Sequence, residues 1–332
     1  MKSKQLLIIV IMYKFDIMKF KFVGILAFCV GLVSFPSCDT DVEALEIQKL
    51  KTYDEQYYAN IRAFKQSDHE VSFAYYENWA PIEGVEGSKD PASWGERIKG
   101  LPDSIDIVNL WMGIPTAETH PVAYEDMKYV QEKLGTRFVM HADASHYRHV
   151  FTVDGVEYDM GGSANPSDEI MAAYAKWIVN QVMEPGLDGV DVDYEGWNSN
   201  DIYRLTVELA KYFGPQGSIS NKLLIIDYFN SVPPKDCIPY CDYFVQQAYS
   251  DQVGFLTQPS GFPPEKMIYC ETFGVFYLDG GRLLDYARWE PEVGHKGGCG
   301  VFYLGRNYYS ASGIPYNEFR QAIQIMNPSI KE

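Results

Sequence analysis

The chain is short of cysteine and of basic residues. Its 332 residues include six cysteines, and the closest pair, Cys237 and Cys241, has the spacing of neither a C-x-x-C motif nor a zinc ribbon. This pair either forms a disulfide in an oxidising compartment or stays as two buried thiols. Lys and Arg number 28 against 45 Asp and Glu, which gives a formal net charge of −17. That balance argues against nucleic acids and polyanionic glycans as ligands and favours a neutral ligand.

The N-terminal region lacks a hydrophobic run long enough to span a bilayer. The apolar stretch 22–35 follows a lysine-containing segment and ends just before Cys38. Its length suits a secretory signal peptide better than a transmembrane helix. We therefore predict a lipoprotein-type signal peptide over residues 1–37, with Cys38 as the acylated first residue of the mature chain. The alternative is an ordinary signal peptide with an incidental Cys38, and Met18 is an alternative start.

The segment that follows this leader would connect the lipid to the folded domain. Residues 39–46 are acidic and suit a solvated tether, so we assign residues 38–65 to a lipid-anchored tether and N-terminal segment. Loss of residues 1–37 removes five Lys and one Asp and takes the net charge to about −21. These features predict an exported protein, lipid-anchored to the outer membrane of a Gram-negative bacterium on its periplasmic face or at the cell surface.

No internal repeat, low-complexity tract or linker divides the rest of the chain, and residues 66–332 have the size of one α/β barrel. Short β-branched and aromatic runs predict eight strands: Val71–Tyr75, Ile105–Trp111, Arg137–His141, Leu187–Asp193, Leu223–Tyr228, Tyr243–Tyr249, Lys266–Glu271 and Gly300–Leu304. Apolar stripes at helical spacing separate several of them, as in residues 170–182. Alternating strands and helices predict a (β/α)8 TIM barrel around a closed parallel sheet.

Two connections of this barrel leave little room for a helix. Residues 230–242 and 250–265 are short, and each contains three prolines. Proline interrupts helices because it lacks an N–H and its ring clashes with the preceding turn. We therefore predict that the helices after the fifth and sixth strands are reduced or missing.

The segment 187–195 reads L-D-G-V-D-V-D-Y-E and contains the strongest chemical signal of the chain. The period of a strand places Asp191, Asp193 and Glu195 on one face. Crowding and partial burial would raise the pKa of at least one carboxyl, which is how a protein keeps a general acid protonated near neutral pH. An acidic strand facing water and a calcium loop are the alternatives. The alternation with Val190 and Val192 favours a regular strand with a buried outer face.

This segment resembles the D-G-x-D-x-D-x-E signature of glycoside hydrolase family 18, which includes chitinases and endo-β-N-acetylglucosaminidases. Gln247 and Tyr249, on one face of the sixth predicted strand, resemble the Gln-x-Tyr or Met-x-Tyr element of that family. The resemblance implies a TIM barrel whose chemistry lies at the C-terminal strand ends. The two Pro-rich connections resemble the endo-β-N-acetylglucosaminidase branch more than the chitinases, and an open flank there leaves space for a large branched glycan.

The resemblance also implies a mechanism and a role for each residue. The acids come from one strand and lie too close together to flank a sugar, which matches the substrate-assisted mechanism of this family. In that mechanism Glu195 donates a proton to the leaving oxygen and then acts as base towards water. Asp193 orients the substrate acetamide, while Asp191 shares a proton with Asp193 and holds it in place. Tyr249 hydrogen-bonds the acetamide, with Gln247 close by.

Other residues at predicted strand ends are candidates for contact with the substrate, although packing or capping roles are equally open. These candidates are Tyr75, Asn109, Trp111, Asp227 and Tyr303. The cluster His141, Asp143, His146 and His149 lacks a metal-binding spacing, so we expect neither a metal nor a cofactor.

The sequence leaves three functions to compare. The leading hypothesis is an exported endo-β-N-acetylglucosaminidase that cuts the β-1,4 bond between the two core GlcNAc residues of N-glycans, with retention, and that works beside glycan-uptake machinery. A chitinase is the second; residues 141–146 read H-A-D-A-S-H where chitinases have S-x-G-G, and Phe302 and Tyr303 stand where chitinases have Trp. The third, from another class, is a non-catalytic glycan-binding lipoprotein on the same barrel. All three acids of the motif are present, which argues against this non-catalytic function.

Overall fold

The computed structural model describes residues 52–77, 97–144, 149–161, 165–195, 197–249, 256 and 258–329. The predicted signal peptide, Cys38 and most of the predicted tether lie outside these ranges. None of the helices within them is both long and apolar enough to cross a membrane.

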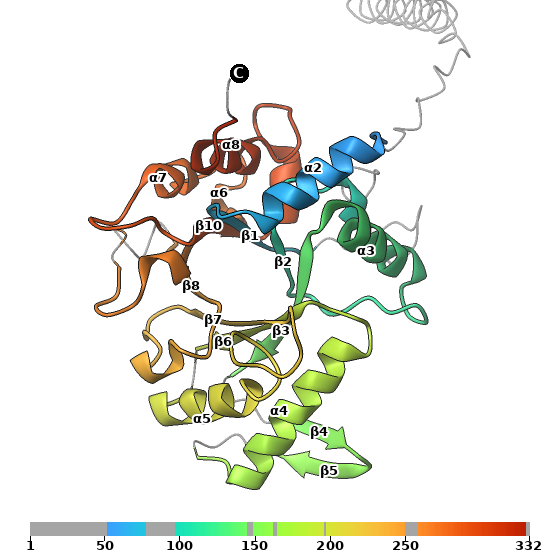
Figure 1. Ribbon diagram of the computed structural model, residues 1–332, viewed down its shortest axis with the longest axis vertical. Helices are drawn as coiled ribbons and strands as arrows, with labels where there is room; N and C mark the ends of the chain where they lie inside the picture. Colours follow the sequence, from blue (N-terminus) through green and yellow to red (C-terminus); the bar gives the residue numbers. More distant parts are fainter. Residues whose placement is uncertain are drawn as a thin grey trace, which may run out of the picture. The chain divides into compact units, whose positions relative to one another are not determined.

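Eight parallel strands close into a barrel in the order β1-β10-β9-β8-β7-β6-β3-β2, and Figure 1 looks into the ring that they form. The strands are β1 Val71–Tyr75, β2 Ile107–Leu110, β3 Arg137–Asp143, β6 Gly189–Tyr194, β7 Leu223–Tyr228, β8 Tyr243–Gln247, β9 Met267–Thr272 and β10 Gly298–Phe302. The predicted TIM barrel is confirmed, and the bounds of β1 and β7 agree with the prediction.

Both faces of the sheet are buried, which explains the near-continuous apolar runs of its strands. Alternate residues such as Phe73, Val139 and Ile225 fill the barrel interior. Their neighbours in sequence, such as Met140 and Ile226, pack outward in the core beneath the helices. On β6 this alternation sends the valines outward and the aspartates inward.

The surrounding helices are α2 Glu55–Gln66, α3 Pro121–Leu134, α4 Asp168–Met183, α5 Ser199–Leu209, α6 Phe273–Phe276, α7 Leu283–Arg288 and α8 Asn317–Met326. After β7, and in the described part of the chain after β8, there are only the 3-10 turns η3 Lys235–Cys237 and η4 Pro264–Lys266. The predicted reduction of the helices after the fifth and sixth strands is confirmed.

Two elements extend the fold beyond the sequence-based expectations. Helix α2 contacts α3 and buries Tyr58 in the core, so the folded unit includes residues before the expected boundary at 66. A hairpin of β4 Val150–Val153 and β5 Val156–Asp159 packs on α4, as Figure 1 shows. Asp154 and Gly155 both have positive φ at its turn, as a two-residue type I′ turn requires.

The cysteines outside the N-terminal region are all unpaired thiols. Cys237, Cys241, Cys270 and Cys299 are free and buried. For Cys237 and Cys241, the structure therefore supports the second of the two alternatives drawn from their spacing.

Candidate active site

The three acids of the motif form a ladder from the barrel interior to its surface. Asp191 is fully buried on β6, whereas the side chain of Asp193 is 20% exposed. Glu195 follows the C-terminal end of β6 and is exposed. It lines a cavity of about 200 Å³ together with Tyr194, Trp197, Phe229, Asn230 and Ser231. This placement puts Glu195 within reach of a ligand and Asp191 out of reach.

Asp191 is held by a side chain from β2. Asn109 Nδ2 donates a hydrogen bond of 2.8 Å to Asp191 Oδ2, and both residues are fully buried. Burial raises the pKa of Asp191 to about 7, the charge of Asp193 adds to this effect, and the bond from Asn109 opposes it. Asn109, which the sequence made a candidate for substrate contact, is therefore a buried residue that holds Asp191 in place through this hydrogen bond.

Tyr75 and Asp227, two further candidates for substrate contact, are bonded to each other across the barrel interior. The Tyr75 hydroxyl on β1 donates a hydrogen bond to Asp227 Oδ2 on β7. Their exposed fractions are 2% and 0%, so both lie beneath the surface of the site. Burial raises the pKa of both groups, and the charge of Asp191 adds to the shift.

Asp193 stands among the other carboxyls and a neutral histidine. Burial raises its pKa to about 10, and the negative charges of Asp227 and Glu195 contribute. His141 Nε2 on β3 lies 3.6 Å from Asp193 Oδ2, but burial lowers the pKa of His141 to about 4, so its ring is neutral near pH 7. The motif predicted a raised pKa for at least one carboxyl. In the structure the pKa values of Asp191, Asp193 and the neighbouring Asp227 are all raised.

The described residues supply no Lys or Arg in ion-pair contact with these three buried carboxyls. Three adjacent buried anions without a cation are strongly unfavourable, so the cluster retains at least one proton near neutral pH. His141 completes this cluster, although sequence reasoning considered it only with the histidines. Its inward register on β3, opposite Asp191, is the signal that would have identified it.

The predicted Gln-x-Tyr element lies next to the acids. Gln247 Nε2 at the end of β8 lies 3.4 Å from both Asp193 Oδ1 and Asp227 Oδ2, so it bridges the two carboxyls. Tyr249 follows two residues later, partly buried, and its ring lies 6.0 Å from that of Phe302 in a stacked orientation. Burial raises the pKa of Tyr249, which keeps its hydroxyl protonated as a donor.

An aromatic group covers the barrel mouth beside these polar residues. The Trp111 ring, just after β2, lies 4.9 Å from Phe302 and 5.1 Å from Tyr303. Phe302 also contacts Tyr75 at 5.6 Å, directly above the Tyr75–Asp227 pair in the interior. Sugar rings pack their C–H faces on such aromatic surfaces, and so the group supplies an apolar wall for a glycan.

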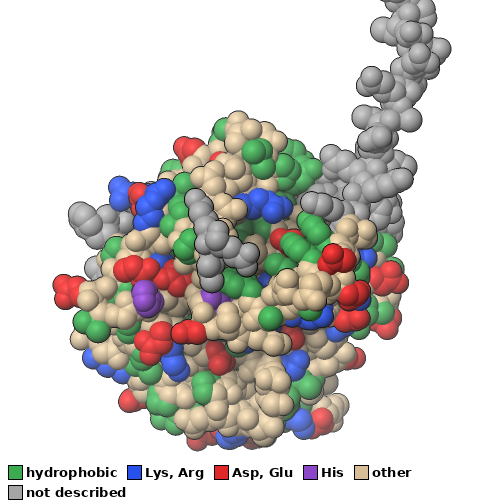
Figure 2. Space-filling view, turned by 45° about the horizontal axis from the view of Figure 1, so that its top comes forward, with side chains coloured by type: hydrophobic (Ala, Val, Ile, Leu, Met, Phe, Trp, Pro, Cys, Tyr) green, Lys and Arg blue, Asp and Glu red, His purple; other side chains and the backbone are tan. Residues whose placement is uncertain are grey.

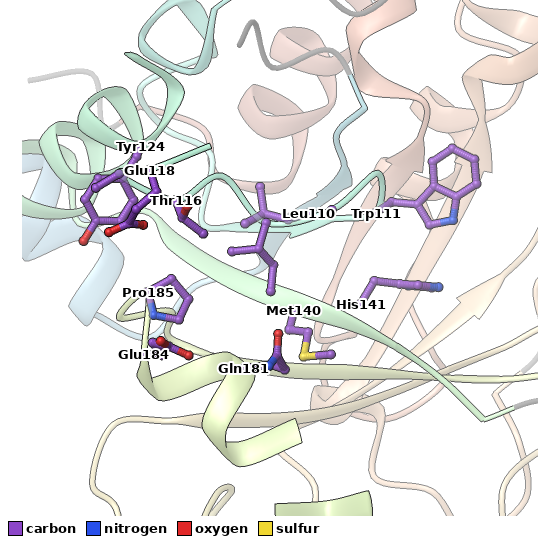
Figure 3. Close-up of a pocket in the computed structure, with 13 residues that line it drawn as sticks. Leu110, Trp111, Thr116, Glu118, Tyr124, Met140, His141, Gln181, Glu184 and Pro185 are labelled. Carbon is purple, nitrogen blue, oxygen red and sulfur yellow. The ribbon is translucent and has the colours of Figure 1, made fainter. Parts of the chain in front are cut away.

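A separate crevice of about 450 Å³ lies on the outer side of β2 and β3. In Figure 3, Leu110 and Met140 point towards the lining residues from α3 and α4, whereas Trp111 and His141 point to the other side of the strands. Glu118, Gln181 and Glu184 provide polar groups at its edge. The crevice thus lies mainly on the side of the strands away from the acids, although Trp111 and His141 line it as well.

Two members of the predicted histidine cluster lie at the acidic site, His141 beside Asp193 and Asp143 opposite it in the register of β3 and β6. His149 packs against Phe151, Tyr174 and Trp177, and His146 lies outside the described residues. One described group, Glu70, Glu290 and His295, brings ligand atoms within 4.8 Å of one another. Lys296 Nζ already lies 2.7 Å from Glu70 and 3.0 Å from Glu290, so an ammonium group neutralises these acids.

The face of the molecule drawn in Figure 2 carries charges of both signs. On the described part of the face in Figure 2, acidic side chains are dispersed and intermixed with basic ones. The Arg306 guanidinium is one cation near the site, and it lies over the Tyr303 ring at 4.4 Å. Such a surface offers glycan hydroxyls both donors and acceptors.

A barrel with carboxyls at the C-terminal end of one strand is compatible with a glycosidase, and the comparisons with known proteins identify the family. The sequence model of glycoside hydrolase family 18, BT1044-like, matches residues 40–257. The chain belongs to this family and is a glycoside hydrolase.

One curated relative and two solved structures resemble this chain over most of its length. The chain is 27% identical over 307 residues to endo-β-N-acetylglucosaminidase F2 of Elizabethkingia meningoseptica, covering 81% of this chain and 85% of that protein. The structure of BT1044 superposes with a TM-score of 0.65 at 19% identity, covering 82% and 93% of the two chains. An endo-β-N-acetylglucosaminidase of Cordyceps militaris, in complex with fucosyl-N-acetylglucosamine-Asn, gives 0.64 at 20% identity, covering 84% and 98%. These two structural likenesses support the fold.

Proposed function

We propose that the protein is an endo-β-N-acetylglucosaminidase that cleaves the β-1,4 bond between the two core GlcNAc residues of N-glycans. The observation that carries this proposal is the ladder of Asp191 and Asp193 on β6 and Glu195 just after it, in which Asp191 is buried, Asp193 is partly buried and Glu195 is exposed. The similarity to endo-β-N-acetylglucosaminidase F2 supports the substrate class. The short 3-10 turns that stand after β7 and in the described part of the chain after β8, in place of helices, also support it, because they leave one flank of the barrel less covered.

The proposed chemistry uses the substrate's own amide as nucleophile. Adjacent acids on one strand cannot stand on opposite faces of a sugar, as the two carboxyls of most glycosidases do. Glu195 therefore donates a proton to the leaving oxygen, and the 2-acetamido oxygen attacks the anomeric carbon to form an oxazolinium ion. Glu195 then removes a proton from the water that opens this ring, and the anomeric configuration is retained.

The neighbouring groups stabilise charge during this step. Asp193 accepts a hydrogen bond from the acetamide N–H and stabilises the positive charge that develops there. Tyr249 donates to the acetamide group, and Gln247 orients Asp193 through their contact at 3.4 Å. Trp111 and Tyr303 support the apolar face of a sugar ring.

We further propose that the enzyme is exported and lipid-anchored through Cys38. This rests on the sequence of residues 1–38. A lipid anchor at the outer membrane would place the enzyme next to glycan-uptake machinery, which would import the released glycan. Metabolic labelling with a palmitate analogue tests this, because wild type incorporates label and Cys38→Ala does not; label in Cys38→Ala contradicts the assignment.

The activity is tested with three substrates: ribonuclease B, a glycoprotein with complex-type glycans, and chitin oligomers. We expect mass spectra in which a glycoprotein retains one GlcNAc at each glycosylated Asn, while chitin oligomers stay intact. Cleavage of chitin alone would favour a chitinase. Glycan binding without release from any substrate would indicate a binding protein.

A further inference from the structure

Tyr303, one of the aromatic residues at the barrel mouth, has a backbone conformation that is rare for a bulky side chain. Its φ of 63° and ψ of 50° lie in the left-handed region, just after β10 and directly before the 3-10 segment η5 Leu304–Tyr309. The Cβ of an L residue crowds the following carbonyl oxygen in this conformation, so glycine is the usual residue there. Strained residues of this kind persist only where the surrounding structure holds them, and they cluster at binding and active sites.

The carboxyl group of Glu77 holds the backbone that follows this strained residue. Tyr303 occupies the N-cap position of η5, but its side chain makes no capping hydrogen bond. Gly305 N instead donates a hydrogen bond of 3.3 Å to Glu77 Oε2, two residues after the end of β1. This acceptor satisfies an N–H that has no partner within the helical turn. Burial raises the pKa of Glu77 to about 7, and the neutral acid can still accept this bond through its carbonyl oxygen.

The side chain of Arg306 holds the Tyr303 ring itself. Its guanidinium lies over the ring at 4.4 Å, and its Nη1 donates a hydrogen bond of 2.6 Å to the carbonyl oxygen of Gly274 on α6. Gly274 borders the same ring, because a Cβ added to Gly274 would lie 3.3 Å from Tyr303 Cδ2. A cation that is anchored to the neighbouring loop therefore fixes the position of the ring.

These contacts place the Tyr303 ring where a sugar would pack. The ring lies 4.2 Å from that of Phe302 and 5.1 Å from that of Trp111. Tyr303 is partly exposed and Arg306 is exposed, so both reach the surface at the barrel mouth. Tyr303 thus presents part of its ring to a ligand, in an orientation set by Glu77 and Arg306.

We propose that Glu77 and Arg306 are positioning residues for substrate affinity, which hold Tyr303 in its left-handed conformation with its ring oriented to pack on a sugar of the glycan. This inference rests on the proposed function and adds two residues that act on the substrate through Tyr303. A ring that is already oriented loses little conformational freedom when the sugar binds, which favours binding. The chemical step depends on the acids and is not altered.

Kinetics on the glycoprotein that the wild type cleaves test the role of Arg306. Arg306→Leu should raise KM about tenfold with kcat unchanged, as loss of one ordered aromatic contact does. Arg306→Lys keeps a cation and should lie between Arg306→Leu and wild type. Arg288→Leu is the matched control, since Arg288 is also exposed and also bonds a backbone carbonyl, that of Leu284 at 3.1 Å. A KM equal to wild type in Arg306→Leu would overturn the proposal, and so would the same rise in KM in Arg288→Leu.

Two variants of Glu77 test the acceptor. In Glu77→Gln the amide oxygen can still accept from Gly305 N, so KM should stay within about threefold of wild type, whereas Glu77→Leu should raise KM about tenfold. Equal KM values in the two variants would overturn the positioning role of Glu77.

A double-mutant cycle tests whether Arg306 acts through the Tyr303 ring. In a Tyr303→Leu background, Arg306→Leu should cause no further rise in KM, because two residues that act through one contact are not additive. A full additional rise would show that Arg306 contacts the glycan itself, and the positioning role would be wrong.

Thermal unfolding tests the strain at Tyr303 without using activity. Tyr303→Gly and Tyr303→Ala both remove the ring, but only glycine adopts the left-handed conformation without crowding. We expect Tyr303→Gly to have a Tm about 2–4 °C above that of Tyr303→Ala. An equal or lower Tm would contradict the strain.

A crystal structure of Arg306→Leu shows whether the ring depends on its cation. We expect the Tyr303 ring to be displaced from its wild-type position, and an unchanged ring would overturn the proposal. If the wild type cleaves no glycoprotein, the proposed function fails, while the unfolding data and this structure still report how Tyr303 is held.

Discussion

Asn109 on β2 donates a hydrogen bond of 2.8 Å to Asp191 on β6, across a barrel in which β3 separates the two strands. This contact holds the lowest acid of the ladder at its Oδ2, while Asp191 Oδ1 has no hydrogen-bond partner among the described residues. Removal of the amide would take away the 2.8 Å hydrogen bond that this buried carboxyl accepts, which costs about 1–3 kcal/mol.

We therefore predict that Asn109→Leu lowers the free energy of unfolding by about 1–3 kcal/mol and lowers kcat. Asn109→Gln, which keeps an amide but displaces it, should lie between this variant and wild type. Urea unfolding and initial rates on a glycoprotein substrate measure both effects. Stability equal to wild type in Asn109→Leu would show that Asp191 does not depend on this donor.

Glu195→Gln should abolish turnover and preserve glycan binding. The amide has nearly the shape of the acid and cannot deliver a proton to the leaving oxygen, and because Glu195 is exposed the substitution does not disturb the buried core. Mass spectra of a digested glycoprotein and calorimetric titration with the released glycan give the two quantities. Activity within about tenfold of wild type would contradict the assignment of Glu195 as the acid.

The fold could be predicted from sequence because the ends of several strands are clearly marked by a change from apolar to polar residues. Val71–Tyr75 and Leu223–Tyr228 are apolar runs flanked by polar residues, and the structure has the same bounds. The hairpin β4–β5 is harder to predict because each strand has only four residues, in the connection that precedes the predicted helix over residues 170–182. Asp154-Gly155 is a recognisable hairpin turn signal in retrospect.

The active site was predicted in part, and the limit lies in the register between strands. The motif alone places Asp191, Asp193 and Glu195 on one face, because that depends only on the strand period. The position of Asp227 beside Asp193 depends on the register in which β6 and β7 pair. This register cannot be read from the sequence of either strand alone. For the same reason the sequence leaves both substrate contact and packing open for Tyr75 and Asp227, which meet in the barrel interior.

The aromatic group at the barrel mouth should contribute to substrate affinity rather than to the chemical step. Trp111→Leu removes the ring that contacts both Phe302 and Tyr303. We expect KM to rise about tenfold with little change in kcat, because one aromatic contact contributes about 0.5–1.5 kcal/mol beyond its buried area. Tyr309→Leu, at an aromatic that is 58% exposed, is the matched control and should leave KM unchanged. A fall in kcat alone would mean that Trp111 acts on the acids instead.

The raised pKa of Asp191 should make the protein less stable as pH rises. Burial raises this pKa from its ordinary value of 3.8 to about 7, so the folded state binds the proton more tightly than the unfolded state does between these values. The free energy of unfolding therefore falls as pH rises through this interval, and the penalty is complete above it. Asparagine cannot ionise, so Asp191→Asn should raise Tm more near pH 8 than near pH 5. Thermal unfolding of both proteins at these two pH values measures the difference. An equal change in Tm at both pH values would show that ionisation of Asp191 does not destabilise the folded state. The destabilising effect of burial would then lie with Asp193 and Asp227.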